Sequence, residues 1–344
     1  MNRRHFIGAA AALGLAPFAV RAQARSPRYA DMHSHIAMWG KDAATQNIRA
    51  SMEQGDMLLV ARKYVADGQV IRLMAGGYGV HRSAAPGELA ANFDKNVPLM
   101  RARHRREGLV EVLSAADLER VLRERSPAIV LSSEGADFLE GDLKRLQAAR
   151  ALGVVHLQIV HYRVSEVGDI CTERPVHGGL TAFGKEVVAA CNRLGILVDV
   201  AHCTSAGIEQ ALDISAKPLV SSHGFVADFQ PSHTMDGARA RGLHLPVARK
   251  IAAKGGVVGF WALGQQFRSL GGMADAVIDA AQKLGAEHVG IGSDLAGMPT
   301  TVMRTYAEFA ELGELLNKRG VKGEDLDNIL GMNYVRVLRQ ALAA

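Results

Sequence analysis

The feature that most constrains this chain is an alternation of short apolar runs with helical stretches, repeated from residue 29 to the C-terminal end. The apolar runs have the length and composition of strands buried on both faces, as in a parallel sheet covered by helices. We predict strands at 29–32, 69–75, 127–133, 154–160, 196–201, 217–222, 256–261 and 288–293. Eight strands that alternate with helices predict an α/β protein with a (β/α)8 TIM-like barrel.

Helical periodicity fills the intervals between these runs. Apolar residues recur at helical spacing over 44–67, and Asp67-Gly68 marks the expected end of that helix. A short helix is predicted to begin at Ser114, and others at 87–106, 141–152, 181–194, 205–214, 246–254, 272–284, 303–318 and 324–342. No stretch reads as a linker or a short-period repeat, so a single domain is the simplest arrangement.

The first residues are expected to be a targeting segment. Asn2-Arg3-Arg4-His5-Phe6-Ile7 is a twin-arginine opening, followed by an apolar run from Ala9 to Val20 and by the small residues of Ala22-Gln23-Ala24. The run is too short to span a bilayer. We expect residues 1–24 to be a Tat signal that is removed on export, with a helix packed on the domain as the alternative. Residues 25–344 would then form the barrel in the periplasm.

Charge and aromatic content argue against a nucleic-acid partner. The chain has 40 Lys and Arg against 35 Asp and Glu, a formal net charge of +5. Three of the arginines lie in the expected signal, and its removal would leave about +2. An aromatic fraction of 5% offers little surface for base stacking. We expect a small-molecule substrate, no nucleic acid and no membrane span after signal removal.

Side chains that can bind metals or transfer protons recur where the predicted strands end. The set comprises His33, His35, Glu134, His161, His202, His223 and Asp294. A barrel builds its active site at the carboxyl ends of its strands, so residues far apart in sequence would meet at one mouth. One polar residue at a strand end is usually turn chemistry. Six strand ends out of eight that carry His, Glu or Asp indicate a common site.

The residue types suit a pair of divalent metal ions. His33 and His35 leave an extended segment on the same side, and imidazole is the commonest metal ligand in proteins. A carboxylate can bridge two cations, and Glu134 is the natural candidate. Water bound to such ions is a nucleophile at neutral pH. The pattern therefore indicates hydrolysis of an amide by a metal-activated hydroxide.

Several longer segments carry a resemblance to a known family. They are Asp31-x-His33-x-His35, Glu134-Gly-Ala-Asp-Phe-Leu-Glu-Gly-Asp142, Gly153-Val-Val-His-Leu-Gln-Ile-Val-His161, Gly179-Leu-Thr-x-Phe-Gly184, Asn192-Arg-Leu-Gly-Ile-Leu-Val-Asp-Val-Ala-His202, Pro218-Leu-Val-Ser-Ser-His223 and His288-Val-Gly-Ile-Gly-Ser-Asp294. In order and spacing they resemble the zinc dipeptidases of the renal, or membrane, dipeptidase type, which are metal-dependent hydrolases of the TIM-barrel superfamily. The resemblance covers most of the chain after the expected signal.

The resemblance implies hydrolysis of the peptide bond of dipeptides in a binuclear zinc site. His33 and His35 would bind one Zn²⁺, His202 and His223 would bind the other, and Glu134 would bridge the two ions. Other divalent metals remain open. The family is often dimeric, so the resemblance also implies a homodimer.

The resemblance implies substrate-binding and catalytic roles for further residues. His161 would contact the scissile carbonyl or stabilise the oxyanion, and Asp294 would handle the substrate amine or a proton. Glu134 is also available for proton transfer. Arg241 falls where the family has an arginine that holds the substrate carboxylate, and Arg239 is the alternative in this divergent loop.

Two departures from the family pattern leave alternatives open. The dipeptidases usually have H-x-D at the first motif, whereas this chain has His35, and Ala296 stands where the family often has another aspartate. His35 favours a second hypothesis, in which the same barrel hydrolyses D-aminoacyl, N-acyl amino acid or lactone substrates. A periplasmic binding protein that uses the same cavity is the third. Asp199 is expected either to orient a ligand or to make a buried hydrogen bond in the core.

Overall fold

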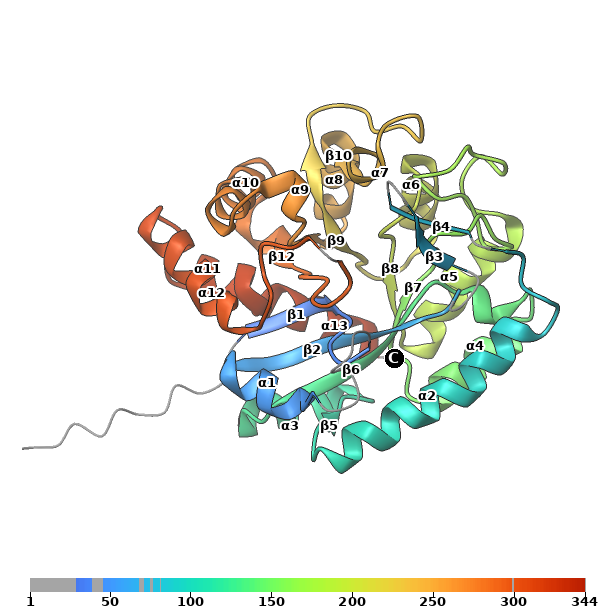
Figure 1. The fold of residues 1–344 in the computed structure, drawn as a ribbon, viewed down its shortest axis with the longest axis horizontal. Helices are drawn as coiled ribbons and strands as arrows, with labels where there is room; N and C mark the ends of the chain where they lie inside the picture. The colour runs from blue at the N-terminus through green and yellow to red at the C-terminus, as the bar shows by residue number, and fades with distance from the viewer. Residues whose placement is uncertain are drawn as a thin grey trace, which may run out of the picture.

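Eight parallel strands form a nearly closed ring at the centre of the protein (Figure 1). The computed structural model describes residues 29–38, 46–67, 71–74, 77–80, 82–298 and 300–343. The strands follow the order β1-β2-β6-β7-β8-β9-β11-β12 around the ring. Their bounds are β1 Tyr29–Ser34, β2 Met57–Val65, β6 Ala128–Glu134, β7 His156–Gln158, β8 Leu197–Asp199, β9 Val220–Ala227, β11 Val257–Phe260 and β12 Val289–Ile291. The predicted (β/α)8 barrel is confirmed.

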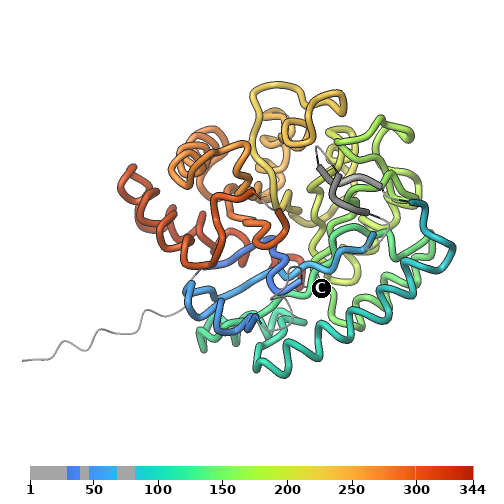
Figure 2. Tube along the Cα trace, in the orientation of Figure 1, coloured from blue at the N-terminus to red at the C-terminus, as the bar shows by residue number. Residues whose placement is uncertain are grey.

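Backbone hydrogen bonds close the ring between its first and last strands. The N–H of His35 donates to the carbonyl of Leu295 at 2.8 Å, and the N–H of Asp294 donates to the carbonyl of His33 at 2.9 Å. Figure 2 shows the blue segment of β1 beside the orange-red segment that follows β12. The H-x-H motif is therefore tied directly to the segment that carries Asp294.

Helices surround the ring of strands (Figures 1 and 2). The longer ones are α1 Ile48–Gln54, α2 Glu88–Arg106, α3 Ala115–Glu124, α4 Lys144–Ala151, α5 Ala182–Leu194, α6 Ser205–Ile214, α8 Leu245–Ala253, α10 Leu270–Leu284, α11 Ala307–Lys318 and α13 Asn333–Leu342. Short elements are α7 Gly237–Ala240, α9 Gly264–Phe267, α12 Glu324–Asp327, the 3-10 turns Asp137–Leu139 and Ala286–His288, and the π-helical turn Asn328–Met332.

Local sequence explains where several helices begin. The side-chain oxygens of Ser114, Thr181, Thr204 and Ser269 each accept a backbone N–H from the first turn of the helix that follows. Such a cap satisfies a donor that the helix itself leaves unpaired and stabilises it by about 1 kcal/mol. The predicted helix start at Ser114 is therefore confirmed.

The core fills the space between strands and helices and also one end of the ring. Tyr334 and Leu338 of α13 belong to a buried cluster with Leu59 of β2, Val130 of β6 and Val257 of β11. Burying such a side chain stabilises the fold by roughly 1.5–3 kcal/mol relative to leaving it exposed. The last helix therefore packs across the barrel, and the carboxyl ends of the strands are left to carry the site.

The helix predicted over 44–67 is wrong for its second half. Helix α1 ends at Gln54, a turn at Gly55 and Asp56 follows, and β2 occupies Met57–Val65 as the second strand of the barrel. The run Met57-Leu58-Leu59-Val60 is buried on both faces, and a short apolar run of this kind satisfies helical and strand patterns equally well.

The strand predicted at 69–75 is consequently not part of the ring. Its described portion is β3, Ile71–Met74, which pairs antiparallel with β4, Gly77–Val80. Two further short strands extend the barrel sheet: β5, Val110–Glu111, pairs with β6, and β10, Gly242–His244, pairs with β9. Strand β9 also runs further than predicted, so His223 lies within the strand instead of after it.

The expected signal at residues 1–24 lies outside the described residues. Among the helices that the structure describes, none has both the length and the apolar character needed to cross a bilayer.

Candidate metal centre

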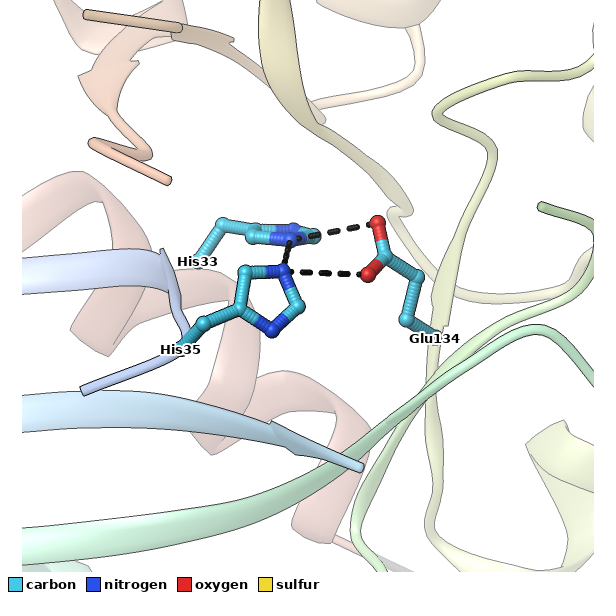
Figure 3. A group of neighbouring side chains, drawn as sticks. All are labelled: His33, His35 and Glu134. Carbon is cyan, nitrogen blue, oxygen red and sulfur yellow. Dashed lines mark hydrogen bonds and ion pairs between the residues drawn. The ribbon is translucent and has the colours of Figure 1, made fainter. Parts of the chain in front are cut away.

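Glu134, the last residue of β6, faces two imidazoles from the first strand. Its Oε1 lies 3.3 Å from Nε2 of His33, and its Oε2 lies 3.1 Å from Nε2 of His35 (Figure 3). The two Nε2 atoms are 3.2 Å apart. All three side chains are buried. They form the first candidate metal group.

The same carboxylate faces a second pair of imidazoles from the opposite part of the ring. Nε2 of His202, after β8, and Nε2 of His223, in β9, each lie 3.7 Å from Oε1 of Glu134. These two Nε2 atoms are 3.3 Å apart. In each group of three, the potential ligand atoms lie within 4.8 Å of one another. Glu134 is therefore common to both groups.

The donor set fits two divalent ions of the zinc type. Each group offers two imidazole nitrogens and a carboxylate oxygen, which are ordinary zinc ligands and leave coordination positions open for water and substrate. Two ions that share one carboxylate would lie close enough to act on a single reacting bond. The residues present are thus suited to a binuclear centre.

Burial keeps three of the imidazoles neutral. It lowers the pKa of His33 to about 4 and holds the pKa values of His202 and His223 well below the usual value. The guanidinium of Arg241 lowers the pKa values of both His202 and His223 further. A neutral imidazole keeps a lone pair for a metal, so the site is electrostatically prepared for a cation.

The other two side chains of the centre, His35 and Glu134, are charged. Burial lowers the pKa of His35, but Glu134 and Asp294 outweigh it and raise the value to about 9. Burial likewise raises the pKa of Glu134, but His161, His33 and His35 hold it well below its usual range. A cation that binds His35 must displace a proton, so metal binding and proton release are coupled.

His161 is oriented by a carboxylate that the sequence analysis did not identify. Its Nδ1 lies 2.9 Å from Oδ2 of Asp67, and its Nε2 lies 3.4 Å from Oε1 of Glu134. Burial lowers the pKa of His161, but Asp67 and Glu134 reverse that effect and raise it. Asp67 closely follows β2, so it belongs to the strand-end pattern and was hidden by the wrong helix over 44–67.

Asp294 reaches the first group from the segment after β12. Its Oδ1 lies 3.1 Å from Nε2 of His35 and 3.7 Å from Nε2 of His33. The backbone of Asp294 is left-handed, with φ of 55°, a conformation that costs a non-glycine residue roughly 1–3 kcal/mol. A Cβ at Gly297 would lie 2.0 Å from Oδ1 of Asp294, so a larger residue there would displace this carboxylate from its place beside His35.

The structure separates the two arginines that sequence left as alternatives. Arg241 is buried, its Nη2 lies 2.9 Å from Nε2 of His223, and its guanidinium stands 4.7 Å from the ring centroid of Trp261. Arg239 is exposed and lies over the ring of Phe229. Arg241 is therefore the arginine at the centre.

Tyr162 is a second residue that the sequence analysis missed. Its ring centroid lies 4.6 Å from that of His161 and 4.7 Å from that of His202, and its hydroxyl is hydrogen-bonded to Arg241. Burial raises the pKa of Tyr162 to about 12, so the phenol is neutral and can donate a hydrogen bond. Only its position next to His161 in the sequence could have pointed to it.

A cavity of about 390 Å³ opens beside the second group. His202, His223 and Arg241 line it on the side of the centre, and Cys171 and Glu173 contribute to its wall. The structure thus brings together every site residue predicted from sequence except the alternative Arg239. The assembled residues are His33, His35, Glu134, His161, His202, His223, Arg241 and Asp294.

The curated relatives of this chain include dipeptidases. The dipeptidase tcpJ of Claviceps purpurea (strain 20.1) is 27% identical over 235 residues, 66% of this chain and 54% of that protein. The chain spans about half the length of the first curated relatives it matches, 50–58% of each.

Two solved structures share the barrel fold. The dipeptidase AC, a metallopeptidase, aligns with a TM-score of 0.78 at 18% identity, covering 93% of this chain and all of that one (100%). A metallopeptidase from Rhodobacter sphaeroides, solved with a phosphinate mimic of the dipeptide L-Ala-D-Ala, aligns with a TM-score of 0.75 at 19% identity, covering 92% of this chain and 99% of that one.

The family is shown by a match of sequence over most of the chain. Residues 95–344 match the family model described as membrane dipeptidase, peptidase family M19, and this region includes all the candidate site residues except those of the first strand and Asp67. The chain therefore belongs to the membrane dipeptidase family.

Proposed function

We propose that this protein hydrolyses the peptide bond of dipeptides in a site that holds two zinc ions. One observation carries the proposal: the carboxylate of Glu134 stands between two pairs of imidazoles, with distances of 3.1–3.7 Å to their Nε2 atoms. Membership of the membrane dipeptidase family supports the substrate class, as does the dipeptide mimic bound by the Rhodobacter sphaeroides neighbour.

The two metal groups would divide the ligands between them. His33 and His35 would hold one ion, His202 and His223 the other, and Glu134 would contact both. When bound, such ions supply a water activated for attack on a carbonyl carbon and polarise the carbonyl itself.

The chain's own residues then orient the substrate and handle protons. His161 donates its Nδ1–H to Asp67, and Asp67 and Glu134 raise the pKa of the ring. The protonated ring then has a second N–H at Nε2, on the side of Glu134, which can donate to a carbonyl oxygen as negative charge develops there. Asp294 lies beside His35 and can accept a proton at Oδ1 and pass it to the leaving amine. Glu134 is a second carboxylate available for proton transfer.

Arg241 is suited to bind the free carboxylate of the dipeptide. Its guanidinium is buried next to His223 and stacks on Trp261, and a guanidinium binds a carboxylate through two parallel hydrogen bonds. The cavity of about 390 Å³ that Arg241 lines has room for the side chains of a small substrate.

A substrate panel with metal analysis tests the proposal. Zinc-loaded protein is incubated with L-Ala-L-Ala, L-Ala-D-Ala, an N-acetyl amino acid and a γ-lactone, and chelator-treated protein with and without added zinc is the control. We expect hydrolysis of dipeptides that depends on zinc. Protein that retains zinc and cleaves none of the dipeptides would contradict the proposal.

His35 supports a second candidate on the same barrel. An imidazole at this position, in place of the aspartate usual in the family, makes the first group less negative. It also places a ring nitrogen, instead of a carboxylate, next to Asp294. D-aminoacyl, N-acyl amino acid or lactone hydrolysis is then the alternative, and the same panel separates it from dipeptidase activity. His35→Asp should shift the preference toward dipeptides if the aspartate contributes to recognition of the substrate amine.

We further propose that residues 1–24 direct export to the periplasm by the twin-arginine pathway, which leaves residues 25–344 as the mature protein. Replacement of Arg3 and Arg4 by lysine should retain the protein in the cytoplasm, as measured by cell fractionation. Export of that variant at the wild-type level would contradict this.

A homodimer, implied by the family resemblance, is tested by light scattering of the mature protein.

A further inference from the structure

The hydroxyl of Ser222 lies between one imidazole from each metal group. Its Oγ is 3.1 Å from Nδ1 of His33 and 3.1 Å from Nδ1 of His223. Ser222 is fully buried, and the two rings pack closely, with centroids 3.7 Å apart. A single side chain therefore contacts ligands that belong to different groups.

The hydrogen-bonding capacity of serine matches this position. His33 and His223 both turn Nε2 toward Glu134, at 3.3 Å and 3.7 Å. An imidazole that offers Nε2 to a metal carries its proton on Nδ1 and donates it there. A hydroxyl oxygen has two lone pairs, so Ser222 can accept one N–H from each ring.

The backbone of Ser222 is held by Asp199, the last residue of the neighbouring strand β8. Its backbone N–H donates to Oδ1 of Asp199 at 2.9 Å, and the same oxygen accepts the N–H of Ala201 at 3.0 Å. Nζ of Lys63 donates to Oδ2 of Asp199 at 3.0 Å. Asp199 thereby ties β9 to the segment that leads to His202, so the backbone that carries the Ser222 hydroxyl is fixed relative to that segment.

We propose that Ser222 is a positioning residue shared by both metal groups. Its oxygen selects the Nδ1–H tautomer of His33 and of His223 and sets the orientation of both rings. Removal of one hydroxyl then weakens two metal sites that have only Glu134 as a common ligand. The inference rests on the proposed binuclear centre and deepens it.

A pair of serine variants gives the first test. Ser222→Ala removes the acceptor, and Ser132→Ala is the matched control, because Ser132 is a fully buried serine of β6 whose Oγ has no hydrogen-bond partner among the described residues. Zinc affinity of each site is measured by competition with a chelator. We expect Ser222→Ala to weaken both sites by about 10–100-fold and Ser132→Ala to match the wild type.

The outcomes separate this inference from the proposed function. If wild-type protein binds two ions and Ser222→Ala binds both with unchanged affinity, or loses affinity at one site only, the shared role of Ser222 is wrong while the metal centre stands. If wild-type protein binds no zinc, the proposed centre fails and this inference falls with it.

A measurement on wild-type protein makes the test independent of how the variant folds. Long-range ¹H–¹⁵N spectra of zinc-loaded protein labelled with ¹⁵N-histidine report which ring nitrogen carries the proton. We expect His33 and His223 both to be protonated at Nδ1. A proton on Nε2 of either ring would overturn the proposal.

Discussion

The carboxylate of Asp67 binds the side of the His161 ring that faces away from Glu134, at 2.9 Å from Nδ1. A carboxylate behind an imidazole fixes its orientation and stabilises the ring when it is protonated. Asp67 follows β2, the second strand of the barrel, and His161 follows β7, the fourth, so the contact joins two strand ends on one side of the centre.

Asp67→Asn should reduce kcat by about 10–100-fold without loss of zinc, because His161 loses its orienting charge while the ligands are untouched. Since Asp67 raises the pKa of His161, the variant should also lose activity on the alkaline side at a lower pH than the wild type. Asp213→Asn, an exposed carboxylate on α6, is the control. A pH–rate profile identical to the wild type would contradict the role of Asp67.

Asp199→Asn should reduce the free energy of unfolding by about 3–5 kcal/mol, because it leaves the cation of Lys63 buried without a counter-charge. Urea denaturation of metal-free protein measures the change. Glu314→Gln breaks an exposed pair with Lys318 and should cost less than about 1 kcal/mol. A loss for Asp199→Asn as small as this control would show that Lys63 finds another partner.

His156→Gln should flatten the pH dependence of stability. Burial, reinforced by Lys63, lowers the pKa of His156 to about 4, whereas an unfolded chain has the ordinary value near 6.5. The unfolded state therefore takes up the proton first, and the wild type loses stability as pH falls from 6.5 toward 4. Between pH 7.5 and 5.0 this amounts to about 2 kcal/mol for one residue.

The comparison for His156 uses denaturation of metal-free protein at the two pH values. Other buried histidines contribute in both proteins and cancel in the difference. Equal losses of stability in wild type and His156→Gln would show that His156 is not the neutral group described here.

Arg241→Lys should raise KM for dipeptides by at least about tenfold, because an ammonium cannot make the two parallel hydrogen bonds of a guanidinium. A dipeptide amide, which lacks the carboxylate, should be cleaved equally by variant and wild type. Arg239→Lys is the matched control from the same loop and should leave both substrates unaffected. A larger increase in KM for Arg239→Lys than for Arg241→Lys would show that Arg239, not Arg241, binds the substrate carboxylate.

The barrel and most of the centre could be predicted from the sequence because each strand end is marked by a local pattern, an apolar run followed by a His or a Glu. Glu134, His161 and His202 each follow an apolar run bounded by turns, and the parallel arrangement of strands then brings the ends of those runs together. Asp67 was missed because the strand before it begins with four consecutive apolar residues, Met57–Val60, and such a run fits a helix as well as a strand.

The contacts of Ser222 could not be predicted from the strand pattern. Ser222 lies 189 positions from His33 in the sequence, and their contact depends on how far the β1 and β9 side chains reach across the ring. Tyr162 is similar, since its place beside His202 follows from the path of the loop after β7. Strand patterns predict which ends converge but not which side chains meet.

The role of Glu134 as the group common to both metal sites is tested most directly by zinc content. Mature wild-type protein and Glu134→Gln are dialysed against the same free zinc concentration, with Asp213→Asn, which changes an exposed carboxylate of α6, as the control. We predict two ions per chain for the wild type and the control, and weakened binding at both sites for Glu134→Gln. Retention of two ions by Glu134→Gln at wild-type affinity would contradict the account.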